Sequence, residues 1–145
     1  MERSQGAFGL RIGDGLPVFR IRPTLRNAVM YAAAMWEFQR IHYDEHWARD
    51  AEGLPGAVVQ GPVLGNYLVQ AVQRWIGPTG TLRRIDWRNQ GLVLFGDDLR
   101  CEGAIAAMSG ESPLEVQCAL SMRNQRDEEV MTARATVELP AEWRP

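Results

Sequence analysis

The sequence lacks a surplus of charge of either sign. Its 145 residues include 16 Lys and Arg and 18 Asp and Glu, which gives a formal net charge of −2. Proteins that follow a nucleic-acid backbone or lie on an anionic membrane usually present a broad basic face, which this balance does not provide. We therefore expect neither nucleic acid nor a membrane as a partner.

Long apolar runs and regularly spaced cysteines are also lacking. No stretch reaches the roughly 18 apolar residues of a membrane span, and residues 1–15 contain no apolar segment typical of a signal peptide. Cys101 and Cys118 lie in alternating apolar stretches rather than in a metal-binding or redox spacing, so buried thiols are expected. These features favour a cytoplasmic protein, and the length fits one domain over residues 1–145.

The strongest periodic pattern lies in the middle of the chain. Between Gly61 and Ile76, apolar residues recur every three or four positions, as in one face of a helix: Val63, Leu64, Tyr67, Leu68, Ala71, Val72 and Trp75. The pair Gly77-Pro78 ends the pattern, because neither residue continues a helix well. This segment is expected to form a long, largely buried helix.

Shorter elements are expected before it. Residues 18–22 form a short strand candidate that ends at Pro23. Thr24 offers a hydroxyl N-cap for a helix over residues 25–38, and Asp44 can cap a second helix over residues 45–49.

After the long helix the apolar period changes to two. Apolar and polar residues alternate in three stretches that begin near Leu99, Leu114 and Met131. Residues 109–113 and 124–128 are connectors of hairpin length, so the strands should pair in sequence as an antiparallel meander. Because the dry face of such a sheet must be covered, we expect an α+β fold in which an antiparallel sheet wraps around the one long central helix.

The stretch of sequence between the long helix and the meander is a candidate for contact with another subunit. Arginine, tryptophan and apolar residues mix over residues 82–88, and the sequence contains five tryptophans. Tryptophan and arginine are both favoured at protein interfaces, and a short sheet leaves an edge that another sheet can extend. The pattern favours a dimer, although tryptophans of the core would explain the same composition.

Both histidines lie in residues 35–46, together with several acids. Glu37 stands at the end of the first expected helix and His42 follows a short break, so a carboxylate and an imidazole can converge on a small reactant such as water. A glutamate at a helix end is more often a solvated charge. The string from His42 to His46 also matches an H-x-x-E-H zinc motif, but Asp44 is expected to start a new helix between the two histidines. We therefore expect no metal site.

Residues 33–77 resemble the MaoC-like (R)-specific enoyl-CoA hydratase/dehydratase family of the hot-dog fold. The family signature is Asp-x-Asn-x-x-His-x-Asp, followed by a short helix, a loop and a Gly that opens the central helix. The matching string is Glu37-Phe38-Gln39-Arg40-Ile41-His42-Tyr43-Asp44, and Gln60-Gly61 opens the long helix. The segment FQRIHYD closely resembles the corresponding segment of small MaoC subunits that work in pairs on bulky acyl-CoA thioesters, including steroid side-chain intermediates.

The resemblance implies hydration of a trans-2-enoyl-CoA, or the reverse dehydration, with Glu37 and His42 as the catalytic acid/base pair. It implies that the N-terminus of the central helix, near Gly61, binds the thioester oxygen, although a glycine needed only for the turn into the helix would explain this residue equally well. The acyl chain would lie along the helix, where Gly65 and Asn66 would widen a channel. Arg83 and Arg84 could meet the CoA phosphates, though solvation explains them equally well. No cofactor is implied, and the expected assembly is a homodimer or a heterodimer with another hot-dog subunit.

Two departures from the signature keep other functions open. Glu37 stands where the family has Asp, and Gln39 where it has Asn, so both side chains are longer by one methylene. An alternative is therefore a non-catalytic subunit that supports a catalytic MaoC-like partner. A hot-dog thioesterase is less favoured, because such enzymes normally need a carboxylate on the central helix and none lies between Gly61 and Ile76.

Overall fold

The computed structural model describes residues 7–144 and has at its centre a five-stranded antiparallel sheet. The strands are β1 (Phe19–Ile21), β2 (Thr81–Asn89), β3 (Leu99–Ser109), β4 (Leu114–Arg123) and β5 (Glu129–Leu139). Their order across the sheet is β1-β3-β4-β5-β2. The predicted meander of β3, β4 and β5 is confirmed, and β2 joins it by pairing with β5.

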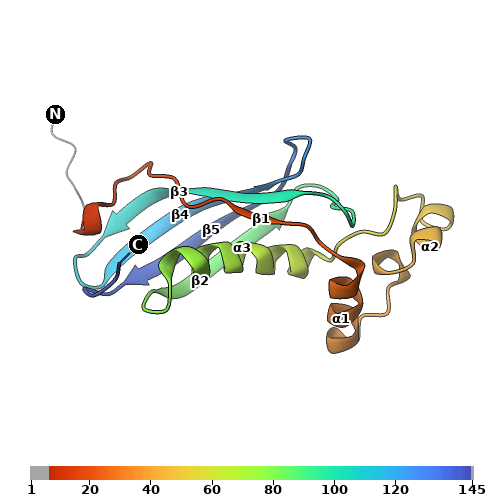
Figure 1. The fold of residues 1–145 in the computed structure, drawn as a ribbon, viewed down its shortest axis with the longest axis horizontal. Coiled ribbons are helices and arrows are strands. Elements are labelled where there is room, and N and C mark those ends of the chain that lie inside the picture. The colour runs from red at the N-terminus through yellow and green to blue at the C-terminus, as the bar shows by residue number, and fades with distance from the viewer. Residues whose placement is uncertain (1–6, 145) are drawn as a thin grey trace.

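The long helix α3 (Gly61–Ile76) lies along one face of this sheet, which curves around it (Figure 1). Its bounds agree with those predicted from the apolar period. The apolar face of the helix is buried against alternating residues of β3, β4 and β5, including both cysteines. Burial of each large apolar side chain contributes about 1.5–3 kcal/mol, so this layer supplies most of the stability of the fold.

Two short helices lie beyond the N-terminal end of α3, at one end of the molecule (Figure 1). They are α1 (Leu25–Met35) and α2 (Glu45–Asp50), and the short 3-10 helix η2 (Arg40–His42) lies between them. Another 3-10 helix, η1 (Ala7–Gly9), lies near the start of the described chain. Thr24 accepts a hydrogen bond from the Asn27 backbone N–H at 3.3 Å, so the predicted cap of the first helix is confirmed.

The first helix ends earlier than predicted. It stops at Met35 rather than at residue 38, because Trp36 adopts the left-handed conformation with φ 53°. The backbone N–H of Glu37 then donates back to the Ala32 carbonyl at 2.9 Å. Glu37 therefore lies outside the helix, in the segment that leads to η2, and not at the helix end as the sequence suggested.

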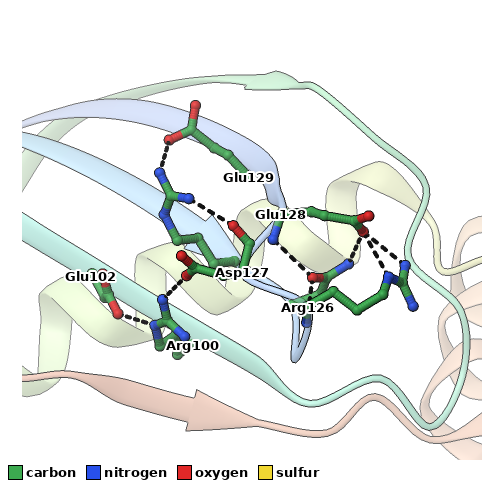
Figure 2. A network of polar contacts seen from close by, with 8 residues as sticks. Arg100, Glu102, Arg126, Asp127, Glu128 and Glu129 are labelled. Atoms are coloured by element: carbon green, nitrogen blue, oxygen red, sulfur yellow. Dashed lines mark hydrogen bonds and ion pairs between the residues drawn. The ribbon is translucent and has the colours of Figure 1, made fainter.

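The turn between β4 and β5 is closed by polar contacts (Figure 2). The buried Asn124 side chain accepts hydrogen bonds from the backbone N–H groups of Arg126 and Glu128, at 3.0 and 3.1 Å. Around it, Arg100 pairs with Glu102 and Asp127, Arg126 with Glu128, and Arg123 with Glu129. Each guanidinium thus has an acidic neighbour, so this face is not a basic patch despite its arginines.

Strand β2 forms one edge of the sheet and carries the Arg/Trp pattern noted above. Its Trp87 is 42% exposed, whereas Trp143, near the end of the chain, is fully buried. The tryptophans therefore divide between surface and core, and the dimer stays a prediction. No helix in residues 7–144 has the length and apolarity needed to cross a membrane.

Candidate active site

His42 is held in place by the loop that precedes α3. The residue ends η2 and is buried, with its Nδ1 2.8 Å from the carbonyl oxygen of Val58. The backbone N–H of Val58 donates to the Ile41 carbonyl at 2.9 Å, so the two segments bind each other at adjacent positions. The ring is therefore fixed by backbone groups rather than by a mobile side chain.

Glu37 lies on the other side of the ring. Its Oε1 is 3.3 Å from His42 Nε2, and the two side chains are 27% and 10% exposed. The left-handed turn at Trp36 redirects the chain so that Glu37 faces the histidine. The residues on either side of Glu37, Trp36 and Phe38, stack edge-on against each other and are 77% and 70% exposed. The structure thus brings together the two residues singled out from the sequence; their catalytic role stays a prediction.

The hydrogen bonds of His42 define where its protons lie. A carbonyl oxygen can only accept, so the Nδ1 that faces Val58 must carry a hydrogen. In the neutral ring Nε2 then has a lone pair, and it faces a carboxylate oxygen that is also an acceptor. A proton on one partner, or a water molecule that donates to both, is needed to make this contact favourable. The pair is therefore suited to hold water and to exchange a proton with it.

The two histidines do not share a helix. His42 belongs to η2 and His46 to α2, and Asp44 lies between them as the predicted N-cap, accepting from the Trp47 backbone N–H at 2.9 Å. This hydrogen bond, together with one from Arg40, holds the pKa of Asp44 below its ordinary value. Within residues 7–144, no group of three or more histidine, cysteine or acidic side chains is arranged to hold a metal ion.

Gly61 is the first residue of α3, as expected, and the space beside it is occupied. A Cβ at this position would lie 2.5 Å from Nδ2 of Asn89, the last residue of β2. The residue before it, Gln60, is only 1% exposed and donates from Nε2 to the Ala28 carbonyl at 3.2 Å. Its Oε1 is buried and has no hydrogen-bond partner among the described residues.

Three groups at this site were not found from the sequence: the Val58 carbonyl, the Gln60 side chain and the Asn89 side chain. Every residue has a backbone carbonyl, so the sequence does not show which one binds a side chain. Asn89 contacts Gly61 only because β2 packs on α3. Gln60 was noted only as part of the Gln60-Gly61 pair. A polar residue in a buried stretch directly before a helix was the one signal that could have singled it out.

Gly65 and the two arginines Arg83 and Arg84 lie in surroundings that differ from those expected. The space beside Gly65 is filled by the ring of Trp87, whose Cε2 would lie 2.5 Å from a Cβ there, so the glycine makes room for packing rather than for a channel. Arg83 pairs with Glu138 at 3.1 Å and Arg84 with Asp86 at 2.5 Å. Both arginines are exposed but already have acidic neighbours.

Comparison with known families identifies the family of the chain. Residues 15–95, more than half of the sequence, match the model of the family hydroxyacyl-thioester dehydratase type 2. This range contains Glu37, His42, Gly61 and Asn89. The chain belongs to this dehydratase family.

Solved structures with the same fold agree with this assignment. An (R)-hydratase from A. caviae involved in PHA biosynthesis has a TM-score of 0.81 at 19% identity, with 90% of this chain and 98% of that chain covered. The R-hydratase PhaJ1 from Pseudomonas aeruginosa gives 0.83 at 20%, covering 94% and 86%. A chain of the ChsH1-ChsH2 complex from Mycobacterium tuberculosis gives 0.77 at 21%, covering 88% and 97%. The fold is thus the MaoC-like hot-dog fold. No curated protein sequence matches the chain.

Proposed function

We propose that the protein hydrates a trans-2-enoyl-CoA thioester to the 3-hydroxyacyl-CoA, or catalyses the reverse dehydration. The observation that carries the proposal is the 3.3 Å contact between Glu37 and a His42 whose other nitrogen is fixed by Val58. Its occurrence in a chain of a hydroxyacyl-thioester dehydratase family supports the same reaction.

In the proposed reaction a water molecule contacts both side chains. One side chain takes a proton from the water while the water oxygen forms a bond to C3 of the substrate. The other side chain delivers a proton to C2. The electron pair of the double bond moves onto the thioester oxygen in between and returns when C2 is protonated. The reaction adds the elements of water and transfers no net electrons, so the proposal needs no redox cofactor.

The negative charge on the thioester oxygen has to be stabilised during this step. The N-terminus of α3 supplies the positive end of a 16-residue helix, and Gly61 is its first residue. Val58, which holds His42, lies three residues before Gly61, and a stretch of that length spans at most about 11 Å. The acid/base pair and the helix end can therefore act on one enoyl group.

We also propose that the enzyme works as a dimer of hot-dog subunits, like or unlike. Strand β2 is an edge of the sheet, and its Trp87 and Arg88 are exposed. An unpaired edge of this kind can be extended by a second sheet. Light scattering at micromolar concentration should show a dimer, either of the chain alone or after co-expression with neighbouring reading frames. A monodisperse monomer under both conditions would contradict the assembly.

The catalytic pair is tested by replacing its members one at a time. His42→Ala or Glu37→Gln should lower the hydration rate of an accepted enoyl-CoA by roughly two to four powers of ten, because either change removes a proton-transfer group. The measurement is the loss of absorbance of the conjugated thioester. Thermal stability, followed by circular dichroism, should change little for Glu37→Gln, which keeps the shape of the side chain.

Two control variants sharpen this test. His46→Ala removes the exposed histidine of α2 and should leave the rate within about twofold. Glu37→Asp restores the residue of the MaoC signature, and retained or increased activity supports the site. Full activity of His42→Ala on every accepted enoyl-CoA would refute it. A parent protein that is inactive even when co-purified with its partner would instead favour a supporting, non-catalytic subunit.

A further inference from the structure

The N-terminus of α3 offers fewer backbone donors than most helix ends. Pro62 has no N–H, and the N–H groups of Val63 and Leu64 both donate to the Gln60 carbonyl, at 3.0 and 3.2 Å. Only the Gly61 N–H is left without an acceptor among the described residues of this first turn. An oxyanion site usually combines two or more donors. A second donor would have to come from a side chain.

Asn89 provides a donor at this position. Its Nδ2 is the nearest atom to the place where a Gly61 Cβ would be, at 2.5 Å, while its Cγ and Oδ1 lie at 3.4 and 3.5 Å. The amino end of the carboxamide is thus the end that faces the helix terminus. Any residue other than glycine at position 61 would push this side chain away.

The backbone of Asn89 is well fixed, which favours a preorganised donor. The residue pairs with Met131 in the β2–β5 ladder, and the N–H groups of the two following residues donate to the Val130 carbonyl at 2.9 and 3.2 Å. The side chain itself is exposed and has no hydrogen-bond partner among the described residues. An amide donor that lies on a fixed backbone and has no protein acceptor is available to a ligand.

The buried side chain of Gln60 is an independent indication of a ligand at this helix end. Its Oε1 is a buried acceptor without a donor, and such groups are rare in native proteins. Gly61 N–H and Asn89 Nδ2 need an acceptor, while Gln60 Oε1 needs a donor. An enoyl thioester with its water, or a 3-hydroxyacyl thioester, brings a carbonyl oxygen and an O–H group together.

We propose that Asn89 is a catalytic residue whose Nδ2 donates to the thioester oxygen alongside the Gly61 N–H. This assignment rests on the proposed hydratase function and adds a residue to it. As water adds to C3, the oxygen gains negative charge and both donor hydrogen bonds strengthen. When C2 takes up its proton, the carbonyl is restored and the hydrogen bonds weaken again.

The test uses binding and turnover of cinnamoyl-CoA and a short series of aliphatic enoyl-CoA thioesters. Donors to the carbonyl oxygen polarise the conjugated system, so binding to the parent should shift the absorption of cinnamoyl-CoA to longer wavelength. Asn89→Ala should lose a large part of that shift and lower kcat by about 100-fold, the typical effect of removing one oxyanion donor. Gln90→Ala removes an amide one residue further, where it donates to Thr132, and should change neither readout.

Asn89→Asp separates donation from a purely structural contact. The carboxylate keeps the shape but offers an acceptor, so it should abolish the red shift and lower kcat at least as much as alanine does. If Asn89 merely caps the helix, aspartate would raise the melting temperature and leave the shift intact, which would overturn the assignment. Gly61→Ala should likewise lower kcat, because the new methyl group displaces the amide.

The outcomes also distinguish this assignment from the function on which it rests. If the parent protein is active and Asn89→Ala has the same kcat and the same red shift, the role of Asn89 is overturned and the hydratase function stands. A parent that neither binds nor hydrates any thioester of the series, alone or with its partner, would overturn both. Loss of kcat and of the red shift together, with an unchanged melting temperature, is the expected result.

Discussion

The two ends of helix α3 are built in opposite ways. At its C-terminal end, Trp143 is fully buried and its Nε1 donates to the Ile76 carbonyl at 2.7 Å. The rings of Phe8 and Trp75 pack edge-on against it, with centroids 5.5 and 6.1 Å away. The Gly77 N–H also donates back into the helix, to Gln73 at 3.0 Å. This end is closed by apolar packing, and the Gln73 and Ile76 carbonyls have donors there.

The N-terminal end is open and incompletely paired. Gly61 N–H and Gln60 Oε1 have no partners among the described residues, and the contact between Glu37 and His42 lies near this end, where His42 is bound to Val58. Unpaired polar groups cost free energy, and proteins commonly retain them where a ligand will satisfy them. The contrast indicates that one end of the helix supplies stability, and it fits the proposal that the other end binds substrate.

The largest stability effect is expected at the closed end. Trp143→Ala should lower the free energy of unfolding by about 3–5 kcal/mol, because it leaves a large cavity and an unpaired Ile76 carbonyl. Urea denaturation gives the value. Trp143→Phe keeps one aromatic ring in the core but loses the five-membered ring with its N–H donor, so it should cost less than Trp143→Ala.

The matched control is a tryptophan at the open end. Trp36 is 77% exposed, so Trp36→Ala should change the free energy of unfolding by no more than about 0.5 kcal/mol. Equal costs for Trp143→Ala and Trp36→Ala would show that the closed end is not the main source of stability, and the division between the two ends would fail.

The long helix and the three central strands were largely predictable from the sequence. The apolar period fixed the bounds of α3, and alternation located β3, β4 and β5, because a half-buried element must repeat with its own geometry. The pairing of β2 with β5 was not predicted, since a local pattern does not say which edge a strand joins. The burial of Trp143 has the same explanation: it follows from where the chain end passes, not from its neighbours in sequence.

The open end was predictable only in part. Glu37 and His42 could be singled out because they are chemically distinctive and match a known signature. The end of α1 was placed three residues too late, because the left-handed turn falls on Trp36, a residue type that seldom adopts it. Asn89 was missed altogether, since its contact with Gly61 joins two elements that are 28 residues apart in sequence.

A smaller effect is expected one turn into the helix, where packing replaces the open site. Gly65 lies under the Trp87 ring, which a Cβ would approach to 2.5 Å. In Gly65→Ala this crowding should cost about 1–3 kcal/mol, whereas the better helix propensity of alanine returns about 1 kcal/mol. The net result should be a modest loss of stability in urea denaturation, on the order of 1 kcal/mol.

The sign of this effect should reverse when the ring is removed. In a Trp87→Ala background the crowding is absent, so Gly65→Ala should stabilise the protein by up to about 1 kcal/mol through helix propensity alone. Gly91→Ala is the control for overpacking, since a Cβ there would meet only Val130 at an ordinary 3.8 Å. If Gly65→Ala costs the same with and without Trp87, the ring does not fill the space beside the glycine. The cost of Gly65→Ala would then come from another contact, and the packing of Trp87 would no longer argue against the substrate channel first expected beside Gly65.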